Sequence, residues 1–147
     1  MQLKFLTEQY YIDYAQYSEM EQKPTRPYAI VLVRAMGYDF AVPFRSNIKH
    51  AYAFWTDREN HCGLDYSKAM IVDVGRHVRL DSRPVIRKIE FKALVGKDTD
   101  VVNGLCRYIQ IYKDAVARPD HPRSKMVLQC STLKYFHKEL GLEPTAE

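Results

Sequence analysis

The sequence predicts a single α+β domain, residues 1–147, built around an antiparallel β-sheet. Three observations lead to this prediction. The chain has 147 residues, 46% of them hydrophobic and 27% charged, which is the size and composition of one globular domain. Two apolar segments joined by a tight turn predict a β-hairpin in the first third, and apolar residues at helical spacing dominate the second half. Hairpins with segregated helices are typical of α+β domains.

The N-terminal segment predicts a strand followed by a helix. Residues 3–6 alternate between apolar and polar and predict a short strand. Thr7 is a good N-cap for a helix that we expect to continue to about Met20. Three tyrosines at helical spacing form one stripe on this helix: Tyr10, Tyr14 and Tyr17. Residues 21–27 hold two prolines and predict a loop.

The hairpin is the clearest element. Tyr28–Ala35 predicts a buried strand, Met36–Gly37 a tight turn, and Tyr38–Phe44 the returning strand. Proline has no N–H to donate, so we expect the second strand to end at Pro43 or to lie at a sheet edge there.

The remaining segments alternate between loop, strand and helix. Residues 45–63 show no steady period and predict a long loop, whereas Lys68–Val74 predicts a third strand. Pro84 and Gly96 bracket a predicted helix over Val85–Val95. The next helix begins near Asp98 or Thr99 and ends before Pro119, and its buried face holds Val101, Leu105, Tyr108, Tyr112 and Val116. Met126–Cys130 predicts a strand, and Ser131 or Thr132 caps a last helix that ends at Gly141.

The charge is modest in total but uneven along the chain. Lys and Arg number 22 against 18 Asp and Glu, a net charge of +4. Residues 1–22 are acidic, whereas residues 76–92 and 118–138 are rich in Lys and Arg. This segregation favours one positive face that suits phosphate groups, although solvated helix faces explain the same pattern equally well.

Several function classes lack their sequence features. The longest clean apolar run, Ala29–Val33, is too short to span a membrane, and no secretion signal opens the chain. Three scattered cysteines fit neither a disulfide framework nor a zinc knuckle, so we expect a cytoplasmic protein. Metal-binding, nucleotide-binding and serine-hydrolase motifs are missing, and we expect neither a metal nor another cofactor.

One segment, Pro43–His50, combines the groups that RNA cleavage without a metal requires. It presents a guanidinium, a hydroxyl, an amide, an ammonium and an imidazole within eight residues. When a ribose 2′-OH attacks the neighbouring phosphate, a base accepts its proton, a cation stabilises the growing charge, and an acid protonates the leaving oxygen. A solvated loop after a strand is the alternative interpretation of the same residues.

At this segment the sequence resembles the toxins of type III toxin–antitoxin systems, the ToxN/AbiQ-like endoribonucleases, and is most similar to their TenpIN branch. The resemblance rests on the order of three blocks: the hairpin from Arg26 to Ser46, Cys62–Val72, and Met126–Gln129. It implies a twisted antiparallel sheet flanked by helices. It also implies metal-independent cleavage of cellular or phage RNA that leaves a 2′,3′-cyclic phosphate.

The resemblance further implies a partner and a biological role. Such toxins are neutralised by a small structured RNA made from tandem repeats, with which they form closed hetero-oligomers. They serve phage defence or plasmid maintenance, and they do not act at membranes.

The resemblance also carries over to individual residues. Ser46 matches the family serine, and Arg45 stands where the family has a threonine. The family lysine falls on Ile48, so Lys49, one place later, or His50 takes its role. The predicted catalytic group is Ser46, Lys49, His50, Arg45 and Tyr11. The predicted RNA-binding residues are Arg26, Tyr28, Arg76, Arg79, Arg83, Arg87, Lys88, Arg123 and Lys125.

Other interpretations remain open. The departures from the family pattern suit a non-catalytic RNA-binding protein on the same scaffold, and a protein-interaction domain requires that the resemblance be accidental. Tyr28, Tyr52 and Trp55 are candidates either for stacking on bases or for ordinary packing.

Overall fold

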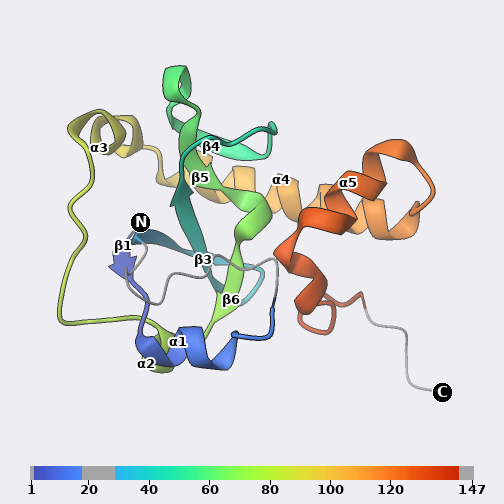
Figure 1. Ribbon diagram of the computed structural model, residues 1–147, viewed down its shortest axis with the longest axis horizontal. Coiled ribbons are helices and arrows are strands. Elements are labelled where there is room, and N and C mark those ends of the chain that lie inside the picture. Colours follow the sequence, from blue (N-terminus) through green and yellow to red (C-terminus); the bar gives the residue numbers. More distant parts are fainter. Residues whose placement is uncertain (1, 18–28, 143–147) are drawn as a thin grey trace.

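The computed structural model describes residues 2–17 and 29–142 and shows a single small α+β domain, as predicted (Figure 1). The described residues form a six-stranded antiparallel sheet, not closed into a barrel, and five α-helices. The strands are β1 (Gln2–Phe5), β2 (Ala29–Ala35), β3 (Tyr38–Arg45), β4 (Ala53–Asp57), β5 (Cys62–Asp65) and β6 (Met70–Val72). The helices are α1 (Glu8–Asp13), α2 (Val74–His77), α3 (Lys88–Leu94), α4 (Asp98–Ala117) and α5 (Pro122–Cys130).

The central strand β3 changes partner halfway along one side. It pairs with β2 on one side, whereas on the other side Asp39–Ala41 pair with β6 and Phe44 and Arg45 pair with β5. Pro43 lies between these two pairings, where the missing N–H interrupts neither of them. The strand does not end at Pro43, since β3 continues to Arg45, but Pro43 lies at a gap in the pairing on the side of β5 and β6.

The predicted hairpin between β2 and β3 is confirmed. Met36 and Gly37 form its turn, with φ angles of 53° and 81°. A two-residue turn with both φ angles positive matches the twist of the strands it joins, and glycine adopts this conformation without steric cost.

The N-terminal helix is shorter than predicted. The Thr7 hydroxyl caps it by accepting a hydrogen bond from the backbone N–H of Tyr10, but α1 ends at Asp13 instead of Met20. Three tertiary contacts hold this end: the Tyr14 hydroxyl donates to the carbonyl of Ile71, and Arg76 and His77 each bind the Asp13 carboxylate. Contacts with the distant segment 71–77 thus decide where the helix stops.

The predicted long loop over residues 45–63 is wrong. It contains β4, a 3-10 turn at Arg58–Asn60 and the start of β5, which together form a hairpin. These strands are short and mix apolar with polar residues, so their alternation is weak in the sequence. In the structure, Phe54 and Leu64 face the core as a cross-strand pair.

Helices α3 and α4 follow the predictions with changed boundaries. α3 begins at Lys88 instead of Val85, and the predicted stop at Gly96 has a positive φ of 72°. The predicted face of α4 is buried at Val101, Leu105, Tyr108 and Tyr112, while Val116 is only partly buried.

The predicted strand at Met126–Cys130 is wrong, because this segment belongs to helix α5. The His121 side chain caps the helix by accepting from the N–H of Arg123, and Pro122 occupies its first turn. Ser124 and Val127, three residues apart, are its buried residues. The last predicted helix reduces to a 3-10 turn at Thr132–Tyr135, capped by Ser131 as expected.

Candidate functional site

The loop that follows β3 lies against the β4–β5 hairpin. Its polar residues Ser46, Asn47 and Lys49 are exposed, whereas Ile48 is buried. The backbone N–H of Ile48 donates to the carbonyl of His61 over 3.0 Å, which ties the loop to the hairpin. The polar side chains that the sequence singled out are thus carried by an anchored loop.

His50, the predicted proton carrier, has both ring nitrogens engaged. Its Nδ1 accepts from the backbone N–H of Tyr52 at 3.0 Å. Its Nε2 lies 3.1 Å from Oδ1 of Asp65 and 3.2 Å from Oγ of Ser67. Because Nδ1 accepts a hydrogen bond, Nε2 carries the proton and donates it to Asp65. This geometry gives His50 a positioning role, since a proton transfer by the ring would break one of these bonds.

Asp65 lies at the centre of a cluster with Arg45, His50 and Ser67, and the sequence analysis did not select it. Its side chain is fully buried, and it accepts from Nη1 of Arg45 at 2.8 Å and from the Ser67 hydroxyl at 2.6 Å. Burial by itself raises the pKa of Asp65, but the hydrogen bonds from His50, Ser67 and Arg45 outweigh it and lower the pKa. Asp65 therefore stays ionised and holds Arg45 and His50 in fixed positions.

A neighbouring pocket brings together residues from distant parts of the sequence. It has a volume of about 350 Å³ and is lined by Phe44, Arg45, Ser46, Cys62, Arg87 and Glu90. Arg87 contacts Oδ2 of Asp57 at 3.0 Å and Oε1 of Glu90 at 3.1 Å. Glu90 also accepts a 2.5 Å hydrogen bond from the Thr56 hydroxyl. Helix α3, which packs against β4, thereby places a carboxylate and a guanidinium beside Ser46.

Glu90 and Cys62 are pocket residues that the sequence reasoning did not select. Glu90 lies three residues after Arg87 on the same helix face, which is the one local signal that could have indicated it. Burial raises the pKa of the Cys62 thiol, which favours the protonated form over a reactive thiolate.

Tyr11 does not join the other predicted catalytic residues. It lies on α1, partly buried against the core, with its ring 5.1 Å from that of Tyr10 in an edge-to-face arrangement. α1 packs beside α2, at the end of β3 opposite the loop that begins with Ser46 (Figure 1). The structure therefore separates Tyr11 from Ser46, Lys49 and His50.

The predicted RNA-binding arginines are partly neutralised by carboxylates. Arg76 binds Asp13 through Nε at 2.5 Å and Nη2 at 2.9 Å, so an acidic residue of the N-terminal segment faces the basic segment. These bonds, with those of His77 and Gln9, hold the pKa of Asp13 well below its usual range. Arg79 contacts Asp81 at 3.2 Å. Arg76 and Arg79 therefore already have carboxylate partners in the folded protein.

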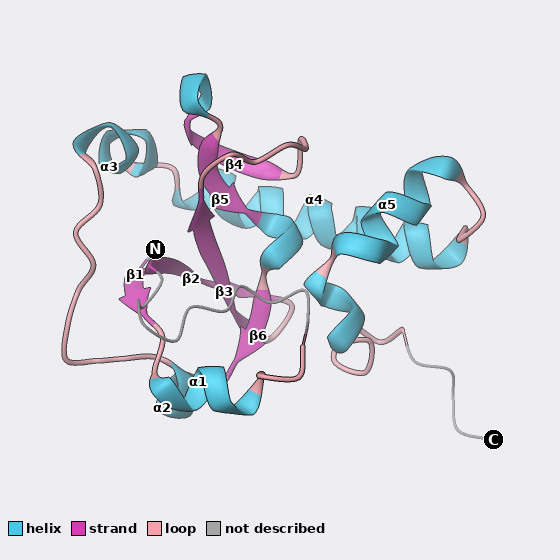
Figure 2. Cartoon of the chain, viewed as in Figure 1, coloured by secondary structure: helices cyan, strands magenta, loops and turns pink. Residues whose placement is uncertain are grey.

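The other basic residues lie on different sides of the molecule. Arg83 belongs to the irregular connection between α2 and α3, and Lys88 begins α3 (Figure 2). Arg123 and Lys125 are exposed on α5, which lies across the molecule from α3 (Figure 1). Arg26 and Tyr28 lie outside the described residues.

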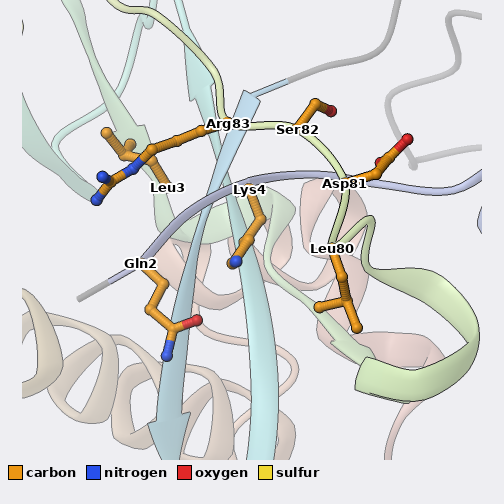
Figure 3. A pocket seen from close by; sticks show the side chains of 7 residues that line it. All are labelled: Gln2, Leu3, Lys4, Leu80, Asp81, Ser82 and Arg83. Carbon is orange, nitrogen blue, oxygen red and sulfur yellow. The ribbon is translucent and has the colours of Figure 1, made fainter.

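A second hollow lies where the connection between α2 and α3 passes β1. It has a volume of about 470 Å³ and is lined by Gln2, Leu3, Lys4 and Leu80–Arg83. Figure 3 shows that Arg83 extends beside Leu3, whereas Lys4 points in a different direction. Its two cations do not converge, so this hollow is a weaker candidate for phosphate than the pocket beside Ser46.

Among residues 2–17 and 29–142, no three His, Cys, Asp or Glu side chains are grouped so as to hold a metal ion. Every helix in this described part is too short or too polar to cross a bilayer. Comparison of the chain with protein-family models, curated proteins and solved structures gave no match.

The position of His50 leads to a prediction about stability. Replacing His50 by alanine removes a donor to buried Asp65 and an acceptor for the Tyr52 N–H, so we expect a loss of about 1–3 kcal/mol in the free energy of unfolding. Lys49→Ala, at the exposed neighbouring position, should change it by less than about 0.5 kcal/mol. Urea unfolding followed by circular dichroism measures both, and equal stabilities would contradict the positioning role.

Proposed function

We propose that the protein is a metal-independent endoribonuclease toxin of a type III toxin–antitoxin system. The observation that carries the proposal is the pocket in which Ser46 lies with Arg87 and Glu90. A carboxylate, a guanidinium and a hydroxyl in one pocket can bind a phosphodiester and accept a proton from a neighbouring ribose. The resemblance of the sequence blocks to type III toxins supports the toxin role, the cyclic-phosphate product and the RNA antitoxin.

In the proposed reaction, the ribose 2′-oxygen forms a bond to phosphorus and the bond from phosphorus to the 5′-oxygen breaks. Glu90 accepts the 2′-OH proton, and Arg87 with the Ser46 hydroxyl stabilises the charge on the non-bridging oxygens. Lys49, exposed on the same loop, supplies a proton to the leaving 5′-oxygen. Arg45 and His50 act indirectly, since Asp65 holds both and thereby fixes the start and the end of the loop.

The proposed partner is a small structured RNA from tandem repeats, which covers the site and keeps the toxin inactive in the cytoplasm. Toxin and RNA units assemble into a hetero-oligomer, and the biological role is phage defence or plasmid maintenance. Short tandem repeats followed by a terminator in the DNA directly upstream of the coding region would support this partner, and their absence would count against it.

The proposal is tested by cleavage in the presence of a chelator. We expect the purified protein, freed of its RNA, to cut single-stranded RNA in excess EDTA and to leave 2′,3′-cyclic phosphate ends. The ends are identified by their resistance to phosphatase before, and not after, mild acid treatment. Activity that disappears with EDTA and returns with magnesium or manganese would contradict the mechanism.

A non-catalytic RNA-binding protein is the second candidate function. The engagement of both His50 nitrogens favours it, because it removes the predicted proton carrier from catalysis. Two results would favour this candidate. The protein would bind RNA with a salt-dependent affinity without cutting it, and it would be harmless when expressed alone.

A further inference from the structure

Trp55 is a large apolar side chain that the core does not use. Phe54 of β4 packs against the core, and after Trp55 the strand register shifts, so that the buried Thr56 binds Glu90 of α3 through its hydroxyl. Trp55, between them, projects to the opposite face and is absent from the core cluster of the described residues. Trp55 is partly buried, so part of its indole is open to another contact.

The strand register places Trp55 on the same face as Arg45. Trp55 pairs with Gly63 of β5, and Gly63 pairs with Arg45 of β3, so the three residues form one row across the sheet. Residues directly opposite one another share a face, and two strand spacings separate the outer pair by roughly 10 Å. A Cβ at Gly63 would collide with the backbone carbonyl of Phe54, so β5 and β4 approach too closely for a side chain there.

A cation and an imidazole lie beside the indole. The Arg58 guanidinium carbon is 5.6 Å from the centroid of the Trp55 ring. The His61 ring meets it nearly edge-on, with 6.2 Å between centroids. Both residues are exposed at the tip of the hairpin, and the His61 carbonyl holds the loop of Ser46 and Lys49 through Ile48.

We propose that Trp55, Arg58 and His61 form a stacking site for an unpaired nucleobase of RNA bound beside the loop of Ser46. This inference rests on the proposed function, because it assumes that RNA reaches this loop. An aromatic face stacks on any base, and a guanidinium over the ring adds a cation–π contact and attracts the phosphate backbone. A base paired within a duplex has no free face, so the site selects single-stranded RNA.

The experiment uses the fact that Trp55 is the one tryptophan of the chain. An unlabelled single-stranded RNA 12-mer with 2′-O-methyl groups cannot be cut by 2′-OH attack, and its titration should quench the Trp55 fluorescence. Anisotropy of the same oligomer with a 3′-fluorescein reports binding independently. We expect both signals to saturate at the same protein-to-RNA ratio, and a blunt duplex of the same sequence to leave the fluorescence unchanged.

Two variants test the contribution of the ring to affinity. Trp55→Ala should weaken binding by about 5- to 150-fold, while Trp55→Phe, which keeps an aromatic face, should lose less. Phe91→Ala is the matched control, since Phe91 is 53% exposed but lines a different pocket with Leu3 and Val31, and it should not change the affinity.

The possible failures are distinguishable. If the oligomer binds by anisotropy but the Trp55 fluorescence and the affinity of Trp55→Ala stay unchanged, the stacking site is wrong and the proposed function stands. If the unmodified chain binds no RNA by either signal, both the proposed function and the stacking site are wrong. Should Trp55→Ala fail to fold, the quenching titration and Trp55→Phe decide the question.

Discussion

Glu90→Gln should slow RNA cleavage by about 10²–10⁴-fold while the protein remains folded, because a single general acid–base group contributes this much to a rate. The glutamine side chain keeps the shape of Glu90 and a carbonyl oxygen that can accept from Thr56, but it takes up no proton from the ribose. The measurement is a single-turnover rate on a fluorescent RNA, with the melting temperature recorded alongside.

The control for this prediction is the same substitution at a remote site. Glu8→Gln alters an exposed glutamate in the first turn of α1, at the far end of β3, and should leave the cleavage rate unchanged. An unchanged rate in Glu90→Gln, with RNA still cut, would place the base elsewhere. Lys49 would then be the next residue to exchange.

Asp65→Asn should lower the free energy of unfolding by about 3–5 kcal/mol, the cost of removing one partner from a buried, hydrogen-bonded charge cluster. The amide of asparagine has an NH₂ group in place of one acceptor oxygen. One of the donors from Arg45, His50 and Ser67 would then face another donor and lose its hydrogen bond. Asp39→Asn is the matched control: its partner Arg34 is 65% exposed, and surface pairs contribute about 0–1 kcal/mol.

The contribution of Asp65 to stability should also depend on pH. Its pKa in the folded protein is lowered, whereas in the unfolded chain it is near the ordinary value of about 3.9. The stabilisation is therefore fully present above about pH 4 and is lost as the pH falls through the lowered native pKa. Urea unfolding at pH 7, 4 and 3 should show the gap between the unmodified protein and Asp65→Asn narrowing with acid. A constant gap would mean that packing, and not the ionised carboxylate, stabilises the cluster.

The sequence located the loop of the candidate site and selected Arg87 for RNA binding, but it did not indicate that Arg87, Glu90 and Asp65 lie around this loop. Ser46 follows the end of a strand that a strong apolar pattern and a glycine turn predict, and such local signals are visible in one sequence. Glu90 and Arg87 lie some forty residues away, and only the packing of α3 on β4 brings them beside Ser46. Asp65 has no distinguishing pattern in the sequence, and only the fold brings its partners Arg45, His50 and Ser67 around it.

By itself the sequence determined the α+β class, the β2–β3 hairpin, the cap at Thr7 and the buried face of α4. Each of these follows from residues close together in the chain: a turn that needs positive φ, a hydroxyl that accepts from a nearby N–H, and apolar side chains at helical spacing. The tertiary structure alone decided the end of α1 and the hydrogen bonds that engage both ring nitrogens of His50. In each case a long-range contact or burial against another element outweighed a weak local preference, because burial and specific hydrogen bonds contribute more free energy than propensity does.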